Sequence, residues 1–235
     1  MDTGGDGRRE TVRYHQEFYA SHELFEEGSW LHKPSPYVLR SLDAVERPAP
    51  LHVLDLGCGV GRHTLPIAQR LPEGSFVVGM DLLPLAAERL TRNAAEAGLG
   101  HLIQAVVADL DHVALAAESI DLLVSVSALE HSRDMSALER LLSQCRRATR
   151  PGGVHCLIMG TDKIEVDADG NSRPAQVEFP LTSADGRVAL EQGYADWETL
   201  SFTTAAFSVD EERDGEAYTL HATNLRLTAR RPGSP

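Results

Sequence analysis

The sequence predicts a doubly wound α/β fold, in which helices cover both faces of a mostly parallel sheet of seven strands. Five short apolar runs that are typical of buried strands alternate with helical patterns between residues 51 and 160. The first run passes through a glycine-rich turn directly into a helix, an arrangement that presents helix N-terminal N–H groups to a ligand. Two longer runs, 197–208 and 217–229, are joined by an acidic loop and predict a final antiparallel hairpin.

The first strand and its turn lie within residues 51–69, which read LHVLDLGCGVGRHTLPIAQ. Gly57 and Gly59 let the backbone bend and approach a ligand within van der Waals distance, where a Cβ atom would intrude. Asp55 stands just before the first glycine, and its carboxylate suits an amine or a bound water and repels a pyrophosphate. The turn therefore favours a positively charged cofactor that carries a nucleoside over a dinucleotide.

Acidic residues end the next two strands. The run 75–81 closes with Asp81, and the run 103–108 is followed directly by Asp109. An acid at the C-terminal end of the second strand can accept the protons of both ribose hydroxyls of a nucleoside. Either acid alone would also be common as a helix N-cap. Two such acids behind a glycine turn favour the cofactor interpretation.

The other parallel strands carry shorter signals. Residues 120–126 form an apolar run that leads into Ser-Ala-Leu-Glu-His, ending at His131. A helix is predicted over 135–149, with basic residues near its C-terminus that complement the helix dipole. The turn Arg-Pro-Gly-Gly at 150–153 then leads into a fifth strand over 154–159.

Taken in order, these motifs resemble those of class I S-adenosylmethionine-dependent methyltransferases. The resemblance rests on VLDLGCGVGRHTLPIA, on the two strand-end acids, on SALEH and on RPGG, and it covers residues 51–160. It implies S-adenosylmethionine as the cofactor, methyl transfer as the activity, and a Rossmann-like sheet with the strand order 3-2-1-4-5-7-6. The C-terminal sequence GYADWETLSF…HATNLRLTARR looks most like tellurite-resistance-type and related bacterial small-molecule methyltransferases.

The resemblance also implies which residues hold the cofactor. The ribose would lie against Asp81, and the adenine amino group would donate to Asp109. The methionine part would lie against the backbone that follows the fourth strand. The implied cofactor-binding residues are Asp55, Gly57, Cys58, Gly59, Asp81, Leu82, Asp109, Leu110 and Ser127.

The chain before the first strand predicts an appendage to this domain. Its first residues are rich in glycine and charge, which is typical of disorder. Pro34 and Pro36 then forbid one continuous helix and predict two. Two roles agree equally well with Trp30: packing against the edge of the sheet, or forming part of a lid over the substrate pocket. The expected division is a disordered tail at 1–10, a helical lid at 11–48, an S-adenosylmethionine-binding methyltransferase domain at 49–231 and a tail at 232–235.

The expected chemistry is an in-line displacement on the methyl carbon of S-adenosylmethionine, whose sulfonium makes that carbon a strong electrophile. A hydroxyl or a protonated amine needs a general base, for which His131 and His32 are the candidates. A structural role is the alternative for both, and it carries more weight for His131. The residues expected to bind a small-molecule acceptor are Trp30, His32, Lys33 and Arg62. No cluster of side chains has metal-ligand spacing, so transfer without a metal is expected.

Composition limits the possible partners. The formal net charge of −13 argues against binding to nucleic acid or to anionic membranes. No apolar run approaches the roughly 20 residues that span a bilayer, and the first residues lack the apolar stretch of a secretion signal. The three cysteines lack disulfide or zinc spacing, which is typical of reduced thiols in a cytoplasmic protein.

The sequence leaves several readings open. A homodimer is neither indicated nor excluded. One alternative function is a protein that binds S-adenosylmethionine without methyl transfer, as a regulator or as a pericyclic-type catalyst, because the same pocket motifs would serve it. A dinucleotide-dependent oxidoreductase is a further alternative, which Asp55 and the strand-end acids disfavour.

Overall fold

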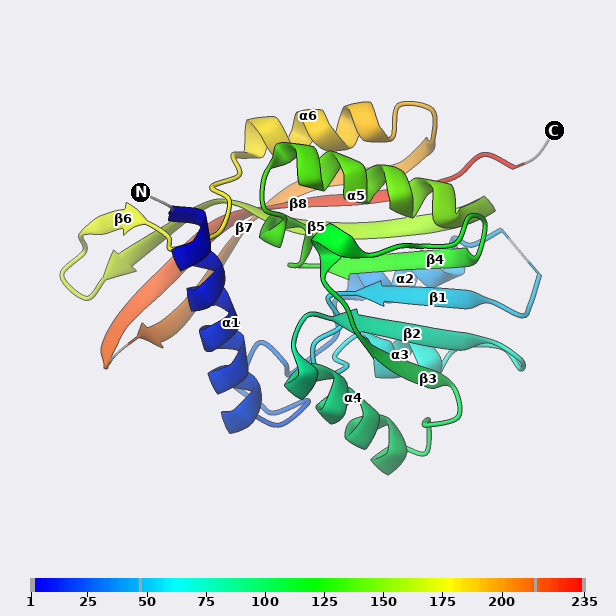
Figure 1. Ribbon diagram of the computed structural model, residues 1–235, viewed down its shortest axis with the longest axis horizontal. Coiled ribbons are helices and arrows are strands. Elements are labelled where there is room, and N and C mark those ends of the chain that lie inside the picture. Colours follow the sequence, from blue (N-terminus) through cyan, green and yellow to red (C-terminus); the bar gives the residue numbers. More distant parts are fainter. Residues whose placement is uncertain (1–2, 47, 214, 234–235) are drawn as a thin grey trace.

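The computed structural model describes residues 3–46, 48–213 and 215–233. Its centre is one sheet in the order β3-β2-β1-β4-β5-β8-β7, with a short eighth strand, β6, paired to β5 (Figure 1). The strands are β1 His52–Leu56, β2 Phe76–Asp81, β3 Ile103–Val107, β4 Ile120–Val126, β5 Thr149–Asp167, β6 Ser172–Pro174, β7 Glu198–Arg213 and β8 Glu216–Arg230. The first five run parallel, whereas β8 pairs antiparallel with both β5 and β7. The predicted strand order and the final hairpin are therefore confirmed, with β6 as an addition.

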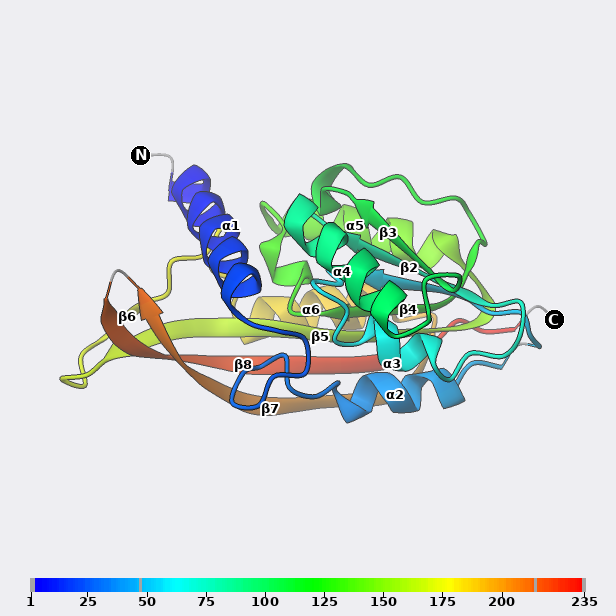
Figure 2. The ribbon, with the colours of Figure 1, turned by 90° about the horizontal axis from the view of Figure 1, so that it is seen from below.

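Helices cover both faces of this sheet. They are α1 Thr3–Ser21, α2 Pro36–Asp43, α3 Thr64–Ala68, α4 Pro84–Glu96, α5 Met135–Ala148 and α6 Ser183–Gly193, with short 3₁₀ helices at η1 Leu110–His112 and η2 Leu129–His131. Leucines of α5 and α6 pack with Leu54 and Leu123 on one face. Val38 of α2 and Ile67 of α3 pack with Val53 on the other face. Figure 2 shows α2 and α3 beside each other there. Alternate residues of the central strands thus enter two separate cores, which explains why these strands are apolar almost throughout.

Helix α1 differs from the prediction at its start. It begins at Thr3, within the segment expected to be disordered, and only residues 1 and 2 of that part lie outside the described residues. Long-range contacts account for the order, because Gly7 lies directly against the backbone of Val177 and Arg8 forms an ion pair with Asp109. In both ribbon views α1 lies between the end of the β7–β8 hairpin and α4, and Arg89 of α4 donates a hydrogen bond to Tyr19 O near the end of α1 (Figures 1 and 2).

The strands at the C-terminal edge are longer than predicted. β5 continues to Asp167 instead of ending at residue 159, and β7 includes most of the acidic stretch that was expected to be a loop. The pairing explains both extensions, since Val166 lies opposite Thr219 and Glu212 opposite Ala217 on β8. The result is a long twisted hairpin that projects beyond the parallel strands toward α1 (Figure 2). None of the helices in the described part of the chain is long and apolar enough to cross a bilayer.

Candidate active site

A cavity of about 290 Å³ opens at the C-terminal ends of the parallel strands. It lies where the chain leaves β1 for β2 on one side and reaches β4 on the other, which is the place where open α/β sheets bind their ligands. Helix α1 forms one wall, and β5, β7 and β8 form the opposite wall. The predicted residues that line it are Trp30, Gly57, Cys58, Gly59, Arg62, Asp81, Leu82, Asp109, Leu110, Ser127 and His131.

The glycine turn after β1 forms the floor of the cavity. Gly57 and Gly59 adopt φ angles of 78° and 52°, which disfavour any other residue. A Cβ on Gly57 would lie 2.3 Å from the Cβ of Ala128, and one on Gly59 would lie 2.6 Å from the hydroxyl of Tyr19. The glycines are therefore required by close packing on both sides as well as by the turn itself.

Asp55 does not line the cavity. Its side chain is buried beneath the turn, where Oδ2 accepts a hydrogen bond of 2.6 Å from Thr64 Oγ1 at the start of α3. Burial raises the pKa of Asp55 to about 6. The structure thus places this acid where it joins the first strand to the helix, and the expected direct contact with an amine is not available from this position.

Asp81 lies at the cavity and also caps backbone groups. Its carboxylate accepts from Gly59 N at 2.9 Å and from Leu83 N at 3.0 Å. A carboxylate has about four lone-pair positions, so acceptor capacity remains for a ligand. Burial raises the pKa of Asp81, an effect that these backbone hydrogen bonds oppose. The cap and the cofactor interpretations of this residue are therefore compatible.

Asp109 is more heavily engaged. It caps η1 by accepting from Asp111 N at 3.1 Å, and its Oδ2 accepts from Arg8 at 2.9 Å and pairs with His112 Nδ1 at 3.2 Å. Burial acts to raise its pKa, but hydrogen bonds from Asp111 and Arg8 outweigh burial and lower it. The carboxylate is thus charged, and the N-terminal part of α1 is attached to it.

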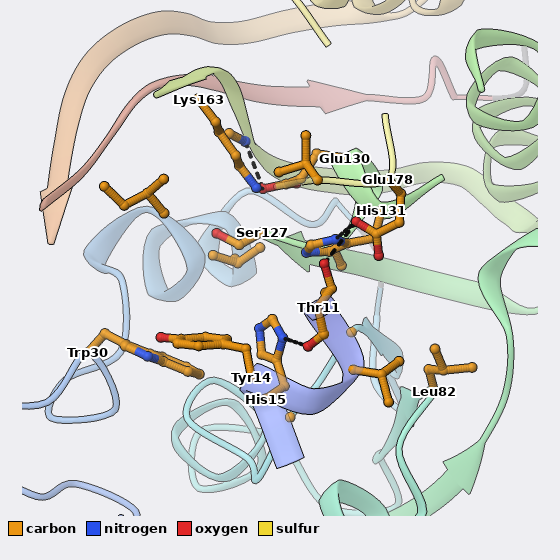
Figure 3. A pocket seen from close by; sticks show the side chains of 18 of the residues that line it. Thr11, Tyr14, His15, Trp30, Leu82, Ser127, Glu130, His131, Lys163 and Glu178 are labelled. Carbon is orange, nitrogen blue, oxygen red and sulfur yellow. Dashed lines mark hydrogen bonds and ion pairs between the residues drawn. The ribbon is translucent and has the colours of Figure 1, made fainter. Parts of the chain in front are cut away.

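His131 belongs to a hydrogen-bonded chain that crosses the cavity wall. Its Nδ1 lies 3.0 Å from Glu178 Oε2, and the same oxygen accepts a 3.0 Å hydrogen bond from Thr11 Oγ1 on α1 (Figure 3). Burial acts to raise the pKa of Glu178, but the contact with His131 lowers it, so Glu178 is an anion at neutral pH. Because a carboxylate only accepts, Nδ1 carries the proton, and Nε2 keeps its lone pair toward the cavity.

Ser127 lies beside these hydrogen-bonded residues, at the end of β4. It is exposed to the cavity and adopts a φ of 54°, a conformation that few non-glycine residues take. Its N–H donates to Ile158 O at 2.8 Å and holds the strained residue in place. Such a conformation beside a cavity is typical of a functional site.

Trp30 and Arg62 meet at the edge of the cavity. Arg62 donates to Trp30 O at 2.6 Å, and its guanidinium lies 5.3 Å from the centre of the indole ring. His32 and Lys33, which were expected beside them, do not line the cavity. Lys33 is exposed, and His32 Nδ1 is buried in the loop without a hydrogen-bond partner among the described residues. The expectation that His32 and Lys33 face the reacting centre is therefore not met, because this turn brings Trp30 and Leu31 to the cavity and leaves the next two residues outside it.

Comparison with known proteins agrees with this geometry. A family model described as a methyltransferase domain matches residues 53–153, from β1 to the turn before the core of β5. Residues 53–153 therefore match a methyltransferase domain, and the chain is similar to class I S-adenosylmethionine-dependent methyltransferases. The family's cofactor, S-adenosylmethionine, agrees with the predicted cofactor.

Individual relatives cover different parts of the chain. Carboxy-S-adenosyl-L-methionine synthase of Chromohalobacter salexigens is 36% identical over 142 residues, which are 60% of this chain and 50% of that protein. The crystal structure of TehB from Haemophilus influenzae superposes with a TM-score of 0.59 at 20% identity, over 82% of this chain and 61% of that one. The [4+2]-cyclase SpnF superposes with a TM-score of 0.64 at 16% identity, over 100% of this chain and 98% of that one.

These similarities have clear limits. The chain spans about half the length of the curated relatives it matches. The two structural similarities concern the fold alone, because sequence identity is low. The similarity to tellurite-resistance-type methyltransferases is therefore one of architecture.

Sequence reasoning missed the contribution of α1 to the cavity. The side chains of Arg8, Thr11, His15 and Tyr19 on this helix line the cavity. Their spacing of three or four residues places them on one helical face, and this pattern of polar side chains was the available signal. Arg8 lies in the segment predicted to be a tail, and the other three lie in the predicted lid, whose expected site residues are Trp30, His32 and Lys33.

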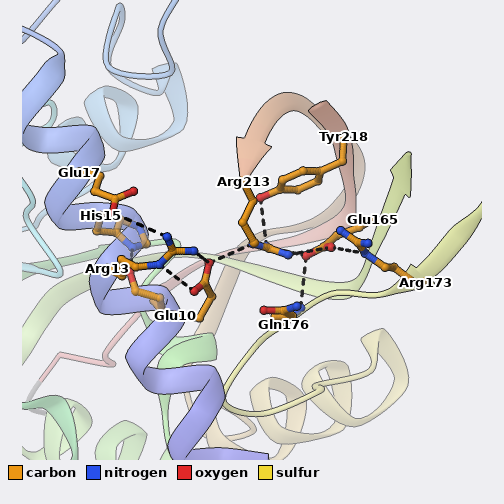
Figure 4. A network of polar contacts seen from close by, with 10 residues as sticks. Glu10, Arg13, His15, Glu17, Glu165, Arg173, Gln176, Arg213 and Tyr218 are labelled. Carbon is orange, nitrogen blue, oxygen red and sulfur yellow. Dashed lines mark hydrogen bonds and ion pairs between the residues drawn. The ribbon is translucent and has the colours of Figure 1, made fainter. Parts of the chain in front are cut away.

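The far wall of the cavity was missed as well. A network of ion pairs joins this wall to α1 (Figure 4). Arg213 of β7 pairs with Glu10 of α1 at 2.9 Å and with Glu165 of β5 at 2.8 Å. Arg173 also pairs with Glu165, at 2.8 Å. Burial acts to raise the pKa of Glu165, but the contact with Arg213 lowers it. Within residues 3–46, 48–213 and 215–233, no group of three or more His, Cys, Asp or Glu side chains is placed to hold a metal ion.

Proposed function

We propose that this protein transfers the methyl group of S-adenosylmethionine to a hydroxyl oxygen of a small acceptor, with His131 as the general base. The observation that carries the proposal is the chain Thr11–Glu178–His131 beside Ser127 (Figure 3). A neutral hydroxyl is a weak nucleophile, so its attack on a methyl group is helped when a positioned base removes the proton. His131 Nε2 has the free lone pair, the exposure to the cavity and the anionic neighbour that such a base needs.

Glu178 would act through the imidazole. Its side chain is 7% exposed and its carboxylate is anionic, so it fixes the tautomer of His131 and stabilises the imidazolium that forms on proton uptake. Thr11 donates to the same carboxylate oxygen and holds it in position. The arrangement therefore orients Nε2 toward an acceptor and places an anion beside the imidazolium that forms.

The residues at the strand ends fit the cofactor. The Gly57–Gly59 turn would let the cofactor approach the backbone closely. The free lone pairs of Asp81 would accept hydrogen bonds from the ribose hydroxyls. The adenine would lie among Leu82, Asp109 and Leu110. Asp109 would have to share its carboxylate with Arg8. When bound, S-adenosylmethionine supplies an electrophilic methyl carbon. Cys58 and Ser127 would border its methionine part, with Asp55 supporting the turn from beneath.

The remaining space is suited to an apolar acceptor body. Phe207, Val209, Leu220 and Ala222 of the β7–β8 hairpin line the wall opposite α1. Trp30, backed by Arg62, closes the side nearest the glycine turn. A mostly apolar surface with a few placed polar groups is typical of small-molecule sites and would exclude water from the reacting methyl.

The test is a turnover assay with S-adenosylmethionine and a panel of phenols and aliphatic alcohols, followed by detection of S-adenosylhomocysteine. His131→Asn, which keeps a side chain of similar shape but accepts no proton at neutral pH, should lower kcat about 10²- to 10⁴-fold. The Kd for S-adenosylhomocysteine should not change. Equal kcat values for the variant and the wild type would exclude His131 as the base.

A second function deserves the same assay. SpnF, whose name describes a [4+2]-cyclase, superposes over the whole of this chain, including α1. A protein of this fold can therefore catalyse a cyclisation, which needs no methyl transfer. Tight cofactor binding with no S-adenosylhomocysteine formed from any hydroxylated acceptor would favour this alternative over methyl transfer.

A further inference from the structure

A second imidazole enters the same cavity beside the proposed base. His15 lies one helical turn after Thr11 on α1, and its ring centre is 5.8 Å from that of His131, with the ring planes at 87°. Both side chains line the cavity. The two histidines come from segments far apart in the sequence, and the fold alone brings them together.

The hydrogen-bonding state of His15 is determined by its partner. Nδ1 lies 2.9 Å from Thr11 O, and because a carbonyl oxygen only accepts, Nδ1 carries the proton. Nε2 is then an acceptor without a hydrogen-bond partner in the described part of the chain. Burial, as the main cause, lowers the pKa of His15 to about 4, so this nitrogen stays unprotonated at neutral pH.

Thr11 links the two rings. Its carbonyl oxygen fixes His15, while its hydroxyl donates to Glu178 Oε2, which fixes His131. In Figure 3 the dashed contacts lie on one side of each ring, and the second nitrogen lies on the other side, toward Ser127 and Tyr14. The cavity therefore presents two acceptor nitrogens together, and a ligand that satisfies both must bring two donors.

We propose that the acceptor carries two neighbouring hydroxyl groups, as in a catechol or a vicinal diol, and that His15 binds the one that is not methylated. A hydroxyl hydrogen-bonds an imidazole nitrogen at about 2.8 Å. Because the two rings are direct neighbours, with centres 5.8 Å apart, two adjacent hydroxyls on the cavity side of the pair can each donate to one ring. This inference rests on the proposed O-methyl transfer and specifies its substrate class.

The two hydroxyls have different fates in this arrangement. The oxygen that faces His131 gives its proton to Nε2 while it forms a bond to the methyl carbon. The carbon–sulfur bond breaks, and its electron pair leaves with the sulfur of S-adenosylhomocysteine. The imidazolium of His131 then releases the proton to solvent. The second hydroxyl keeps its proton and donates it to His15 Nε2, so one methyl group is added to a defined oxygen.

The experiment measures binding of catechol, resorcinol and phenol to the protein saturated with S-adenosylhomocysteine, by calorimetry or ligand-observed NMR. In the wild type we expect catechol to bind about 10-fold more tightly than phenol, since a donor to His15 is gained, and resorcinol to resemble phenol. His15→Phe should remove the preference for catechol, and His15→Gln, whose amide oxygen accepts a hydrogen bond, should restore part of it.

His22→Phe is the matched control, because His22 stacks on Phe18 just beyond α1 and does not line the cavity. It should keep the preference, and melting curves of all variants should confirm a folded state. Equal affinity for catechol and phenol, a preference that survives His15→Phe, or no catechol binding in the millimolar range would each overturn the proposal. Binding needs no turnover, so a catechol preference without S-adenosylhomocysteine formation would reject methyl transfer and retain the paired-donor site.

Discussion

At the scale of single residues, the acids of the cofactor motif do different work. Asp55 is buried beneath the turn and bonded to Thr64, whereas Asp81 lies at the cavity and holds Gly59 N and Leu83 N. The sequence shows both only as an acid at the end of a strand. The two acids differ in their position along the strand, because Asp55 lies within β1 whereas Asp81 is the last residue of β2.

Asp81→Ala tests whether the cap also binds the cofactor. The change should weaken binding of S-adenosylhomocysteine by about 1–3 kcal/mol, because charge-assisted hydrogen bonds to two ribose hydroxyls are lost. Calorimetric titration gives the Kd. Asp134→Ala is the matched control, since Asp134 caps α5 through Ala137 N at 2.7 Å and lies outside the cavity. An equal Kd in Asp81→Ala and the wild type would show that Asp81 only caps backbone N–H groups and does not bind the ribose.

At the scale of elements, α1 is both a cover and a part of the site. It holds Asp109 through Arg8, Glu178 through Thr11 and Glu211 through Tyr14, whose hydroxyl donates at 2.5 Å. Its last turn is anchored differently, because Tyr19 is buried with Leu31 against the glycine turn. The C-terminal end of α1 thus belongs to a core, while its N-terminal half is held by polar contacts that a rearrangement could exchange.

Gly7→Ala tests that half of the helix. In an unobstructed helix, glycine to alanine stabilises by about 0.5–1 kcal/mol, but here the new Cβ would lie 2.4 Å from Val177 O and 2.8 Å from Glu178 N. We expect α1 to shift away from Glu178, so that kcat falls and the melting temperature does not rise.

Gly193→Ala is the matched control for this change, because at the end of α6 the nearest atom to a new Cβ, Leu142 Cδ1, is 3.9 Å away. It should stabilise the protein without a change in kcat. Similar gains in melting temperature for both variants would contradict the tight contact at Gly7.

At the scale of the whole molecule, the sequence predicts the parallel half far better than the rest. The strands β1–β5 are read from local apolar runs, which need no distant partner to be recognised. Burial on both faces accounts for the runs of β1 and β4. The order of α1 and the length of β7 depend on pairs such as Arg8 with Asp109 and Arg213 with Glu165, separated by 101 and 48 residues. Such contacts leave no local pattern, so Glu178 and His15 escaped notice while His131 did not.

Acid stability is a further property of the whole fold. Burial lowers the pKa of His155 to about 3 and that of His15 to about 4, with charged neighbours adding to the effect. Between these values and the unfolded value near 6.5, the unfolded state binds protons that the folded state does not, so stability falls as the pH falls. Asp55 acts in the opposite direction, because its raised pKa of about 6 lets the folded state take up a proton first.

His155→Phe isolates one of these contributions. His155 is fully buried, with its nitrogens 2.6 Å from Thr149 Oγ1 and from Tyr194 OH, so the variant should be less stable than the wild type at every pH. The informative quantity is the slope of the unfolding free energy against pH. Between pH 6.5 and pH 5, the wild type should lose about 2 kcal/mol more unfolding free energy than the variant, since the protonation cost of one buried histidine is removed. Urea unfolding at several pH values measures both curves, and His15 and Asp55 cancel from their difference. Parallel curves would show that the pKa of His155 is not lowered in the folded protein.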